Sequence, residues 1–279
     1  DFGLKTTHFA YRHIGPRSNE VKEMLATVQT DSLDELCQQT IPESIRLDKQ
    51  MSLPTAMSEA ECLDHIAELG SKNKVHKSYI GMGYHPTHLP AVIQRNILEN
   101  PGWYTAYTPY QAEIAQGRLE AVLNFQTMVC ELTGMPLANA SLLDESTAAA
   151  EAMSMLYSLR TAAQKKGEAN EFFVDNNILP QTLAVLQTRA VPLGIKLIQG
   201  DADSWTPSSH FFGAIFQYPG KHGHIIDLQA ATEKAIGLDI KTVVAADIMS
   251  LALLEAPGTF GADVVVGSTQ RFGIPMGYG

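Results

Sequence analysis

The sequence predicts an α/β protein whose mostly parallel sheet is covered by helices on both faces. Short apolar runs alternate with stretches of helical periodicity in its second half: FFVDN, IKLIQG, FFGAIFQYP, TVVAADI and DVVVGS. Such runs are typical of strands buried on both faces of a parallel sheet. The 279 residues are 45% hydrophobic and 18% charged, an ordinary globular composition. We expect a helical N-terminal segment over residues 1–78 and the layered domain over 79–279.

The bulk charge excludes several classes of partner. A net charge of -10 and a pI near 5.3 disfavour binding to nucleic acid or to an anionic membrane, which are themselves negative. No apolar run approaches the roughly 18 residues of a membrane span. Cys37, Cys62 and Cys130 are odd in number, far apart and within helical patterns. They are interpreted as buried apolar side chains of a protein from a reducing compartment.

The pattern of apolar residues predicts three short amphipathic helices between Ser18 and about Ile66 in the N-terminal segment. Ser32 with Glu35, and Ser58 with Glu61, have the spacing of capping boxes. Gly70 is placed to end the third helix. We expect a packing layer; a recognition role is the alternative.

A glycine-rich loop with two histidines follows this segment. Gly81 and Gly83 lack the third glycine and the strand-helix context of a dinucleotide site. His85 and His88 have the spacing of a metal pair, but no third ligand lies nearby in the sequence. They are interpreted as loop histidines, and no metal site is expected.

After a helix expected near 90–98, four aromatic residues fall within eight positions: Trp103, Tyr104, Tyr107 and Tyr110. This loop either packs on the core or on a partner, or offers phenol groups to a small polar ligand. The residues alone leave both interpretations open.

A long helix ending at Gly134 precedes the run Asp144, Glu145, Ser146 and Thr147, which opens an alanine-rich helix. Hydroxyls and free amides at a helix start can bind phosphate with the help of the helix dipole. Two carboxylates at the same place are also ordinary N-terminal caps and would repel phosphate. Chemistry alone favours capping.

The last strands point to a cofactor site with its key residue missing. Ligands of parallel sheets sit beyond the carboxyl ends of strands, where Pro219, Asp247 and Ser268 fall. Pyridoxal-phosphate enzymes of the aminotransferase fold place there an aspartate for the pyridine nitrogen and, one strand later, a Schiff-base lysine. Here the turn carries Gln270 and Arg271, neither of which forms an imine. The sequence contains no GxSxG motif of serine hydrolases, no GxxxxGK[ST] P-loop and no HExxH or CxxC pair of zinc sites.

Several long strings together resemble one family: RHIGP, SYIGMGY, NPGWYTAYTPYQ, ASLLDESTAAAEAM, VVAADIMSLALL and QRFGIPMGYG. From Arg12 to Gly279 the chain is similar to the N-terminal half of the glycine cleavage system P-protein family. The resemblance implies an aminotransferase-like large domain (pyridoxal-phosphate fold type I), cut short before its small domain. The chain begins at Asp1 rather than Met and stops at Gly279 in a glycine-rich turn, so we expect both ends to be trimmed.

The resemblance further implies an activity, a cofactor and partners. The family decarboxylates glycine with pyridoxal phosphate and passes the aminomethyl group to the lipoyl arm of the H-protein. It has two related halves, and this one lacks the lysine. The other half is therefore expected to be the partner and to hold the cofactor, with none bound here. A bacterial cytoplasm or mitochondrial matrix and an oligomeric whole protein are also implied.

The resemblance assigns roles to individual positions. Ser146, Thr147, Asp247 and Gln270 are expected to be remnants of a cofactor site, and no catalytic residue is expected in this half. Tyr104, Tyr107 and Tyr110 are expected to face the substrate pocket of the partner half. The chain should be inactive alone. The alternative is a non-catalytic binding or scaffold protein that retains the fold, while an independent aminotransferase is disfavoured by Gln270.

Overall fold

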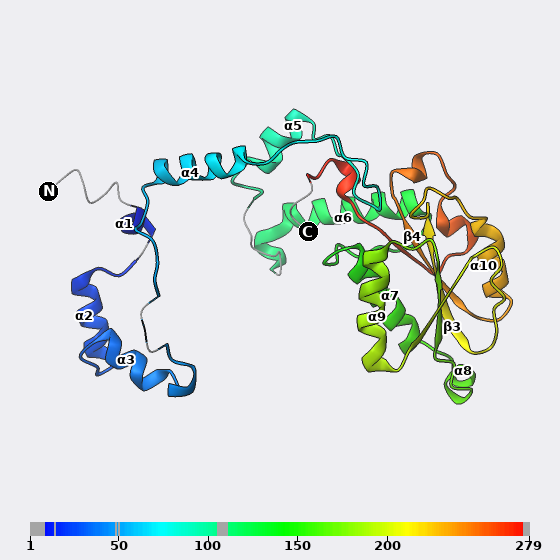
Figure 1. Cartoon of the computed structure of the whole chain (residues 1–279), viewed down its shortest axis with the longest axis horizontal. Helices are drawn as coiled ribbons and strands as arrows, with labels where there is room; N and C mark the ends of the chain where they lie inside the picture. The colour runs from blue at the N-terminus through cyan, green and yellow to red at the C-terminus, as the bar shows by residue number, and fades with distance from the viewer. Residues whose placement is uncertain (1–8, 14, 48, 50, 105–110, 276–279) are drawn as a thin grey trace. The chain divides into compact units, whose positions relative to one another are not determined.

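The computed structural model describes residues 9–13, 15–47, 49, 51–104 and 111–275. Contacts divide the chain between Lys77 and Ser78 into an N-terminal and a C-terminal unit (Figure 1). No helix among the described residues is both long and apolar enough to cross a membrane.

The N-terminal unit contains α1 (Phe9–His13), α2 (Ser18–Thr27), α3 (Leu33–Thr40), the 3-10 turn η1 (Glu43–Ile45) and α4 (Glu59–Ser71). The three predicted helices are confirmed. Ser58 and Glu61 form the complete capping box. Ser32 also caps its helix, but the Glu35 carboxylate accepts from the Asp31 amide instead (2.8 Å). Helix α4 continues to Ser71, one residue past the expected stop.

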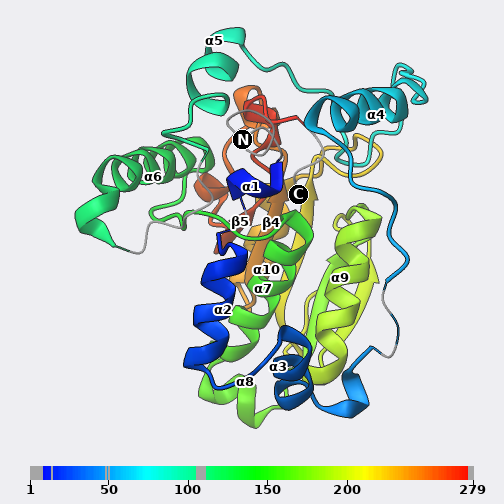
Figure 2. The same cartoon turned by 90° about the vertical axis from the view of Figure 1, so that its left-hand side faces the viewer.

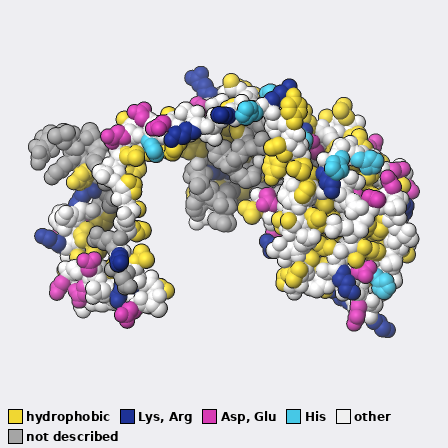
Figure 3. Space-filling view, viewed as in Figure 1, with side chains coloured by type: hydrophobic (Ala, Val, Ile, Leu, Met, Phe, Trp, Pro, Cys, Tyr) yellow, Lys and Arg dark blue, Asp and Glu magenta, His cyan; other side chains and the backbone are white. Residues whose placement is uncertain are grey.

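No described side chain of α2, α3 or α4 is buried. The prediction of buried cysteines was therefore wrong for Cys37 and Cys62, which are exposed, and Cys130 is only half-buried. The physical reason is that these helices form no hydrophobic core of their own. Their apolar stripes remain at the surface, where Figure 3 shows yellow side chains along the N-terminal unit.

The C-terminal unit is built on a parallel five-stranded sheet of order β2-β1-β3-β4-β5. Its strands are β1 (Glu171–Asp175), β2 (Lys196–Gly200), β3 (Phe211–Tyr218), β4 (Lys241–Ala246) and β5 (Val264–Val266). All five strands were predicted from the apolar runs, and the parallel α/β class is confirmed. Every residue of β3, the central strand, is buried.

Helices cover both faces of this sheet. Helices α7 (Glu145–Ser158) and α9 (Pro180–Ala190) lie side by side on one face, as Figure 2 shows. Helix α10 (Leu228–Ile236) covers the other. Because successive strand side chains point to opposite faces, Phe172 joins the first core and Phe173 the second, where it stacks on Trp205 at 4.6 Å.

The other helical elements precede, link or follow the strands and helices of these layers along the chain. The helix expected over 90–98 is α5 (Ala91–Ile93), which continues into a short π-helix, η2 (Gln94–Leu98). Helix α6 (Ala112–Thr133) ends, as predicted, at Gly134, whose φ of 72° favours glycine. The short elements are α8 (Ala162–Lys166), η3 (Val191–Leu193), η4 (Ser250–Ala252), η5 (Pro257–Phe260) and η6 (Gln270–Phe272).

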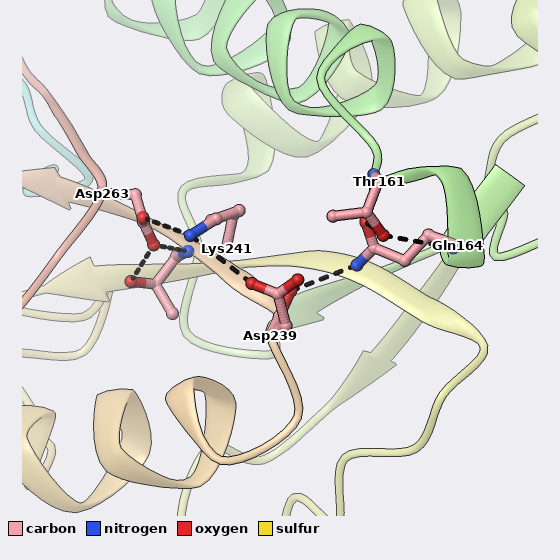
Figure 4. A network of polar contacts seen from close by, with 6 residues as sticks. Thr161, Gln164, Asp239, Lys241 and Asp263 are labelled. Carbon is pink, nitrogen blue, oxygen red and sulfur yellow. Dashed lines mark hydrogen bonds and ion pairs between the residues drawn. The ribbon is translucent and has the colours of Figure 1, made fainter.

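A polar network fixes the amino end of β4 (Figure 4). The Asp263 carboxylate accepts from the Thr242 amide at 2.8 Å and lies 3.3 Å from the Lys241 ammonium. The Gln164 side chain donates to the Asp239 carbonyl at 3.1 Å, which ties α8 to the same end of the strand. These charges serve structure, because they lie at the opposite end of β4 from Asp247.

Candidate ligand site at the carboxyl edge of the sheet

A cavity of about 290 Å³ lies where β3 and β4 end. Three residues predicted to lie at this edge, Pro219, Asp247 and Ser268, line it together with Gln270. The glycine-rich loop contributes Gly81, Met82, Gly83 and His85 from a distant part of the sequence. His88 does not line the cavity, and the described residues contain no group of three side chains suited to hold a metal ion.

The loop after β3 brings a lysine to this cavity. The Gly220 amide donates to the His224 carbonyl and the Lys221 amide to the Asn177 carbonyl, both at 2.8 Å. A side chain at Gly220 would come within 2.7 Å of the Asn177 Cβ, so the close approach requires glycine. Lys221 lines the cavity half-buried, and its ammonium has no carboxylate partner among the described residues.

Asp247 and Arg271 neutralise each other. The guanidinium donates through Nε to Oδ1 at 3.0 Å and through Nη2 to Oδ2 at 2.9 Å. Both side chains are about one-fifth exposed, at 22% for Asp247 and 21% for Arg271. This two-point pairing is the geometry in which arginine binds a carboxylate most strongly. Both oxygens of Asp247 are therefore already engaged.

The start of α7 is capped from within the chain. Asp144 Oδ1 accepts from the Thr147 amide at 2.6 Å, which confirms the capping interpretation. The Ser146 hydroxyl lies 3.2 Å from that of Thr182 on α9, and both Ser146 and Thr147 are buried. Neither of these hydroxyl residues lines the cavity.

Glu145 lines the cavity in their place. Burial raises the pKa of its carboxyl group to about 7, and the nearby charges of Asp247 and Asp144 act in the same direction. The side-chain amide of Gln217 partly opposes this rise in pKa. Glu145 is therefore a titratable group poised near neutral pH.

Gln217 is a polar side chain almost fully buried at the end of β3, at 3% exposure. Its amide nitrogen donates to the Ala245 carbonyl at 3.0 Å, which fixes the orientation of the amide. Its oxygen, Oε1, has no hydrogen-bond partner, although the residue lines the cavity. Unpartnered buried acceptors are rare in native proteins, since each costs about 1–3 kcal/mol.

Asp175 is a second buried carboxyl group at the same edge. Its Oδ1 accepts from the Asn177 amide (3.1 Å) while Oδ2 has no partner, and burial raises its pKa. Asp175 does not line the cavity, whereas Gln217 and Lys221 do, and sequence reasoning missed these two as site residues. A polar residue near the end of an apolar strand run, as in FQYP, is the signal that would have marked Gln217.

The aromatic loop is only partly described. Tyr104 is 62% exposed and does not line the cavity. The predictions for Tyr107 and Tyr110 fall outside the described residues. The structure therefore brings Asp247 and Gln270 together in one cavity, while Ser146, Thr147 and Tyr104 lie outside its lining.

A solved structure has the same fold over nearly the whole chain. It is a crystal structure of glycine decarboxylase (P-protein) of the glycine cleavage system in inhibitor-bound form, with a TM-score of 0.82 and 33% identity. The match covers 96% of this chain and 60% of that one.

Sequence comparison gives higher identity. The chain is 62% identical to a glycine dehydrogenase (decarboxylating) of Flavobacterium johnsoniae and 59% identical to that of Christiangramia forsetii, over 276 residues in each case. These matches cover 99% of this chain but only 29% of either relative. The family model of the glycine cleavage system P-protein matches residues 11–279, and the chain therefore belongs to this family.

Proposed function

We propose that this chain is the N-terminal part of a glycine dehydrogenase (decarboxylating) and that the reacting lysine lies elsewhere in the whole protein. The observation that carries the proposal is Gln270, which lines the cavity just after β5, where an imine-forming lysine is expected. The identity to named glycine dehydrogenases supports the activity of the whole protein. Pyridoxal phosphate supplies that protein with an electron sink for decarboxylation.

The residues of this cavity do not fit pyridoxal phosphate. Asp247 is paired at both oxygens with Arg271, so it is not available to a pyridine nitrogen. Glu145 brings a carboxyl group to the helix start where a phosphate would bind, and the Ser146 hydroxyl is bonded to Thr182. These contacts support the proposal that Ser146, Thr147, Asp247 and Gln270 are remnants of a cofactor site, with the cofactor bound by the other half.

The remaining proposals concern the whole protein. The exposure of Tyr104 leaves its phenol available to a partner, which supports a contribution of Tyr104, Tyr107 and Tyr110 to the substrate pocket of the lysine-bearing half. Glycine and the lipoylated H-protein are the proposed substrate and partner of the whole, oligomeric protein, in a bacterial cytoplasm or mitochondrial matrix. Residues 1–78 and 79–279 are the proposed domains.

Borohydride reduction followed by peptide mapping tests the position of the reacting lysine. The complete protein is loaded with pyridoxal phosphate, reduced and digested. We expect the labelled lysine in a peptide from outside residues 1–279. A specific adduct within this range, for example at Lys221, would overturn the proposal.

The variant Gln270→Lys is the matched control. Because Glu145 and the Asp247–Arg271 pair remain in place, a lysine at position 270 is expected to stay unlabelled. Stoichiometric labelling at position 270 would show that the cavity accepts the cofactor after all.

A further inference from the structure

We propose that the cavity at the carboxyl edge of the sheet binds a small α-amino acid as a non-covalent ligand. The inference rests on the proposed function in one respect, because it takes the reacting lysine and the cofactor to lie in another part of the whole protein. The cavity then becomes a second, non-reacting site formed by Gln217, Glu145 and Lys221.

The first step is the unpartnered acceptor. Gln217 Oε1 is buried without a hydrogen bond, and its amide cannot turn over without setting oxygen against the Ala245 carbonyl. Gln217 lines the cavity, and because its Oε1 has almost no accessible surface, a ligand N–H group supplies the missing hydrogen bond once the cavity wall shifts around the ligand. Pairing this buried oxygen removes the cost of leaving it without a donor, which favours binding.

The second step is the charge beside this acceptor. Glu145 lines the same cavity and interacts with Gln217. Once ionised, its carboxylate attracts a ligand ammonium that also donates to Gln217 Oε1. Two acceptors in one buried place are a suitable environment for a primary ammonium, which has three donors and no acceptor.

The third step is the cation on the same lining. The Arg271 guanidinium is paired with the Asp247 carboxylate. The Lys221 ammonium, in contrast, has no carboxylate within 4.0 Å among the described residues. Glu145 and Lys221 therefore line one cavity without forming an ion pair. A ligand with a carboxylate at one end and an ammonium at the other bridges both.

Size and sign exclude other ligand classes. A cavity of about 290 Å³ is at the lower limit for small-molecule sites, which is too small for a dinucleotide. A simple anion would meet the carboxyl group of Glu145, and a simple cation would meet the Lys221 ammonium. Only a zwitterion satisfies both ends.

Equilibrium dialysis of the complete, cofactor-loaded protein with radiolabelled glycine tests the proposal. We expect one more bound glycine per protomer than the cofactor sites account for. Lys221→Met should weaken this extra binding roughly 10- to 100-fold, the loss of one charge-assisted contact. Lys165→Met, which removes an exposed lysine of α8 outside the cavity, should leave it unchanged. Equal binding by wild type and Lys221→Met would overturn the proposal.

A second variant guards against a loss of folding. Gln217→Met keeps the size of the side chain and removes the unpartnered acceptor. We expect an unchanged or higher melting temperature together with weaker extra binding of glycine. Unchanged binding by this variant would remove Gln217 from the site and contradict the proposal.

Analogues identify the ligand class. Acetate and methylamine each carry one end of glycine and should fail to displace the extra glycine at concentrations where L-alanine displaces it. If acetate, which has no ammonium group, displaces the extra glycine, the cavity is an anion site and the zwitterion proposal is wrong. The change in cofactor absorbance on adding glycine reports the reacting site separately. If the absorbance does not change, the result counts against the proposed function. The dialysis result still decides whether the cavity binds an amino acid.

Discussion

At the scale of single residues, Glu145 couples the site to pH. Burial raises its pKa from the ordinary 4.5 to about 7. Between these values the unfolded chain loses the proton while the folded chain keeps it, so the free energy of unfolding falls as pH rises. The full penalty is present above pH 7. At 1.36 kcal/mol per pKa unit it is about 3 kcal/mol, an upper value because solvent screening reduces it.

The variant Glu145→Gln should remove this dependence. We expect it to be more stable than wild type by about 1–3 kcal/mol at pH 8 and to differ little at pH 4.5. Urea unfolding of both proteins from pH 4.5 to 8 provides the measurement. Parallel stability curves for the two proteins would show that Glu145 is not titrating in this range.

The residue scale also shows how far sequence reasoning reaches. The cap formed by Asp144 was predictable, because its hydrogen bond to the Thr147 amide is local. Two interactions between different elements were not predictable from the sequence. They are the pairing of Asp247 with Arg271 and the interaction of Glu145 with Gln217. The absent lysine was visible in the sequence, but the reason why the remaining residues do not fit the cofactor required the geometry.

At the scale of elements, strands were predictable where burial is complete. The apolar runs of β3 and β4 lie in the middle of the sheet and have nearly every residue buried. The order of the strands was not predicted, because it depends on where crossovers such as α9 and α10 pack. The cysteine prediction failed for the same physical reason: a helical pattern specifies an apolar face but not whether another layer covers it.

Close packing between β4 and β5 gives a test at the same scale. A Cβ at Gly267 would lie 2.2 Å from the Ala246 carbonyl oxygen. Gly267→Ala must therefore push the two strand ends apart, and we expect a loss of about 1–3 kcal/mol. The control is Gly117→Ala in α6, where nothing lies within 4 Å and the substitution should stabilise by about 0.5–1 kcal/mol. Urea midpoints compare the two, and similar effects of both would contradict the packing argument.

At the scale of the whole molecule, the two units differ in what holds them together. The sheet unit has two hydrophobic cores, one on each face, whereas the described helices α2, α3 and α4 bury no side chain. Stability should therefore be distributed unevenly along the chain, because local opening is opposed chiefly by buried apolar contacts.

Native-state hydrogen exchange measures this distribution. We expect the amides of β3 and β4 to exchange slowest and those of α2, α3 and α4 at least roughly a thousand times faster. Helix α6 separates burial from helix length: it has 22 residues, yet Ala115 and Thr133 are its only buried ones among those described. Its amides should exchange fast if burial governs protection. Protection of α2 to α4 equal to that of β3 would mean that a further protein surface covers the N-terminal helices in solution, and it would contradict the uneven distribution of stability proposed for the part of the molecule described here.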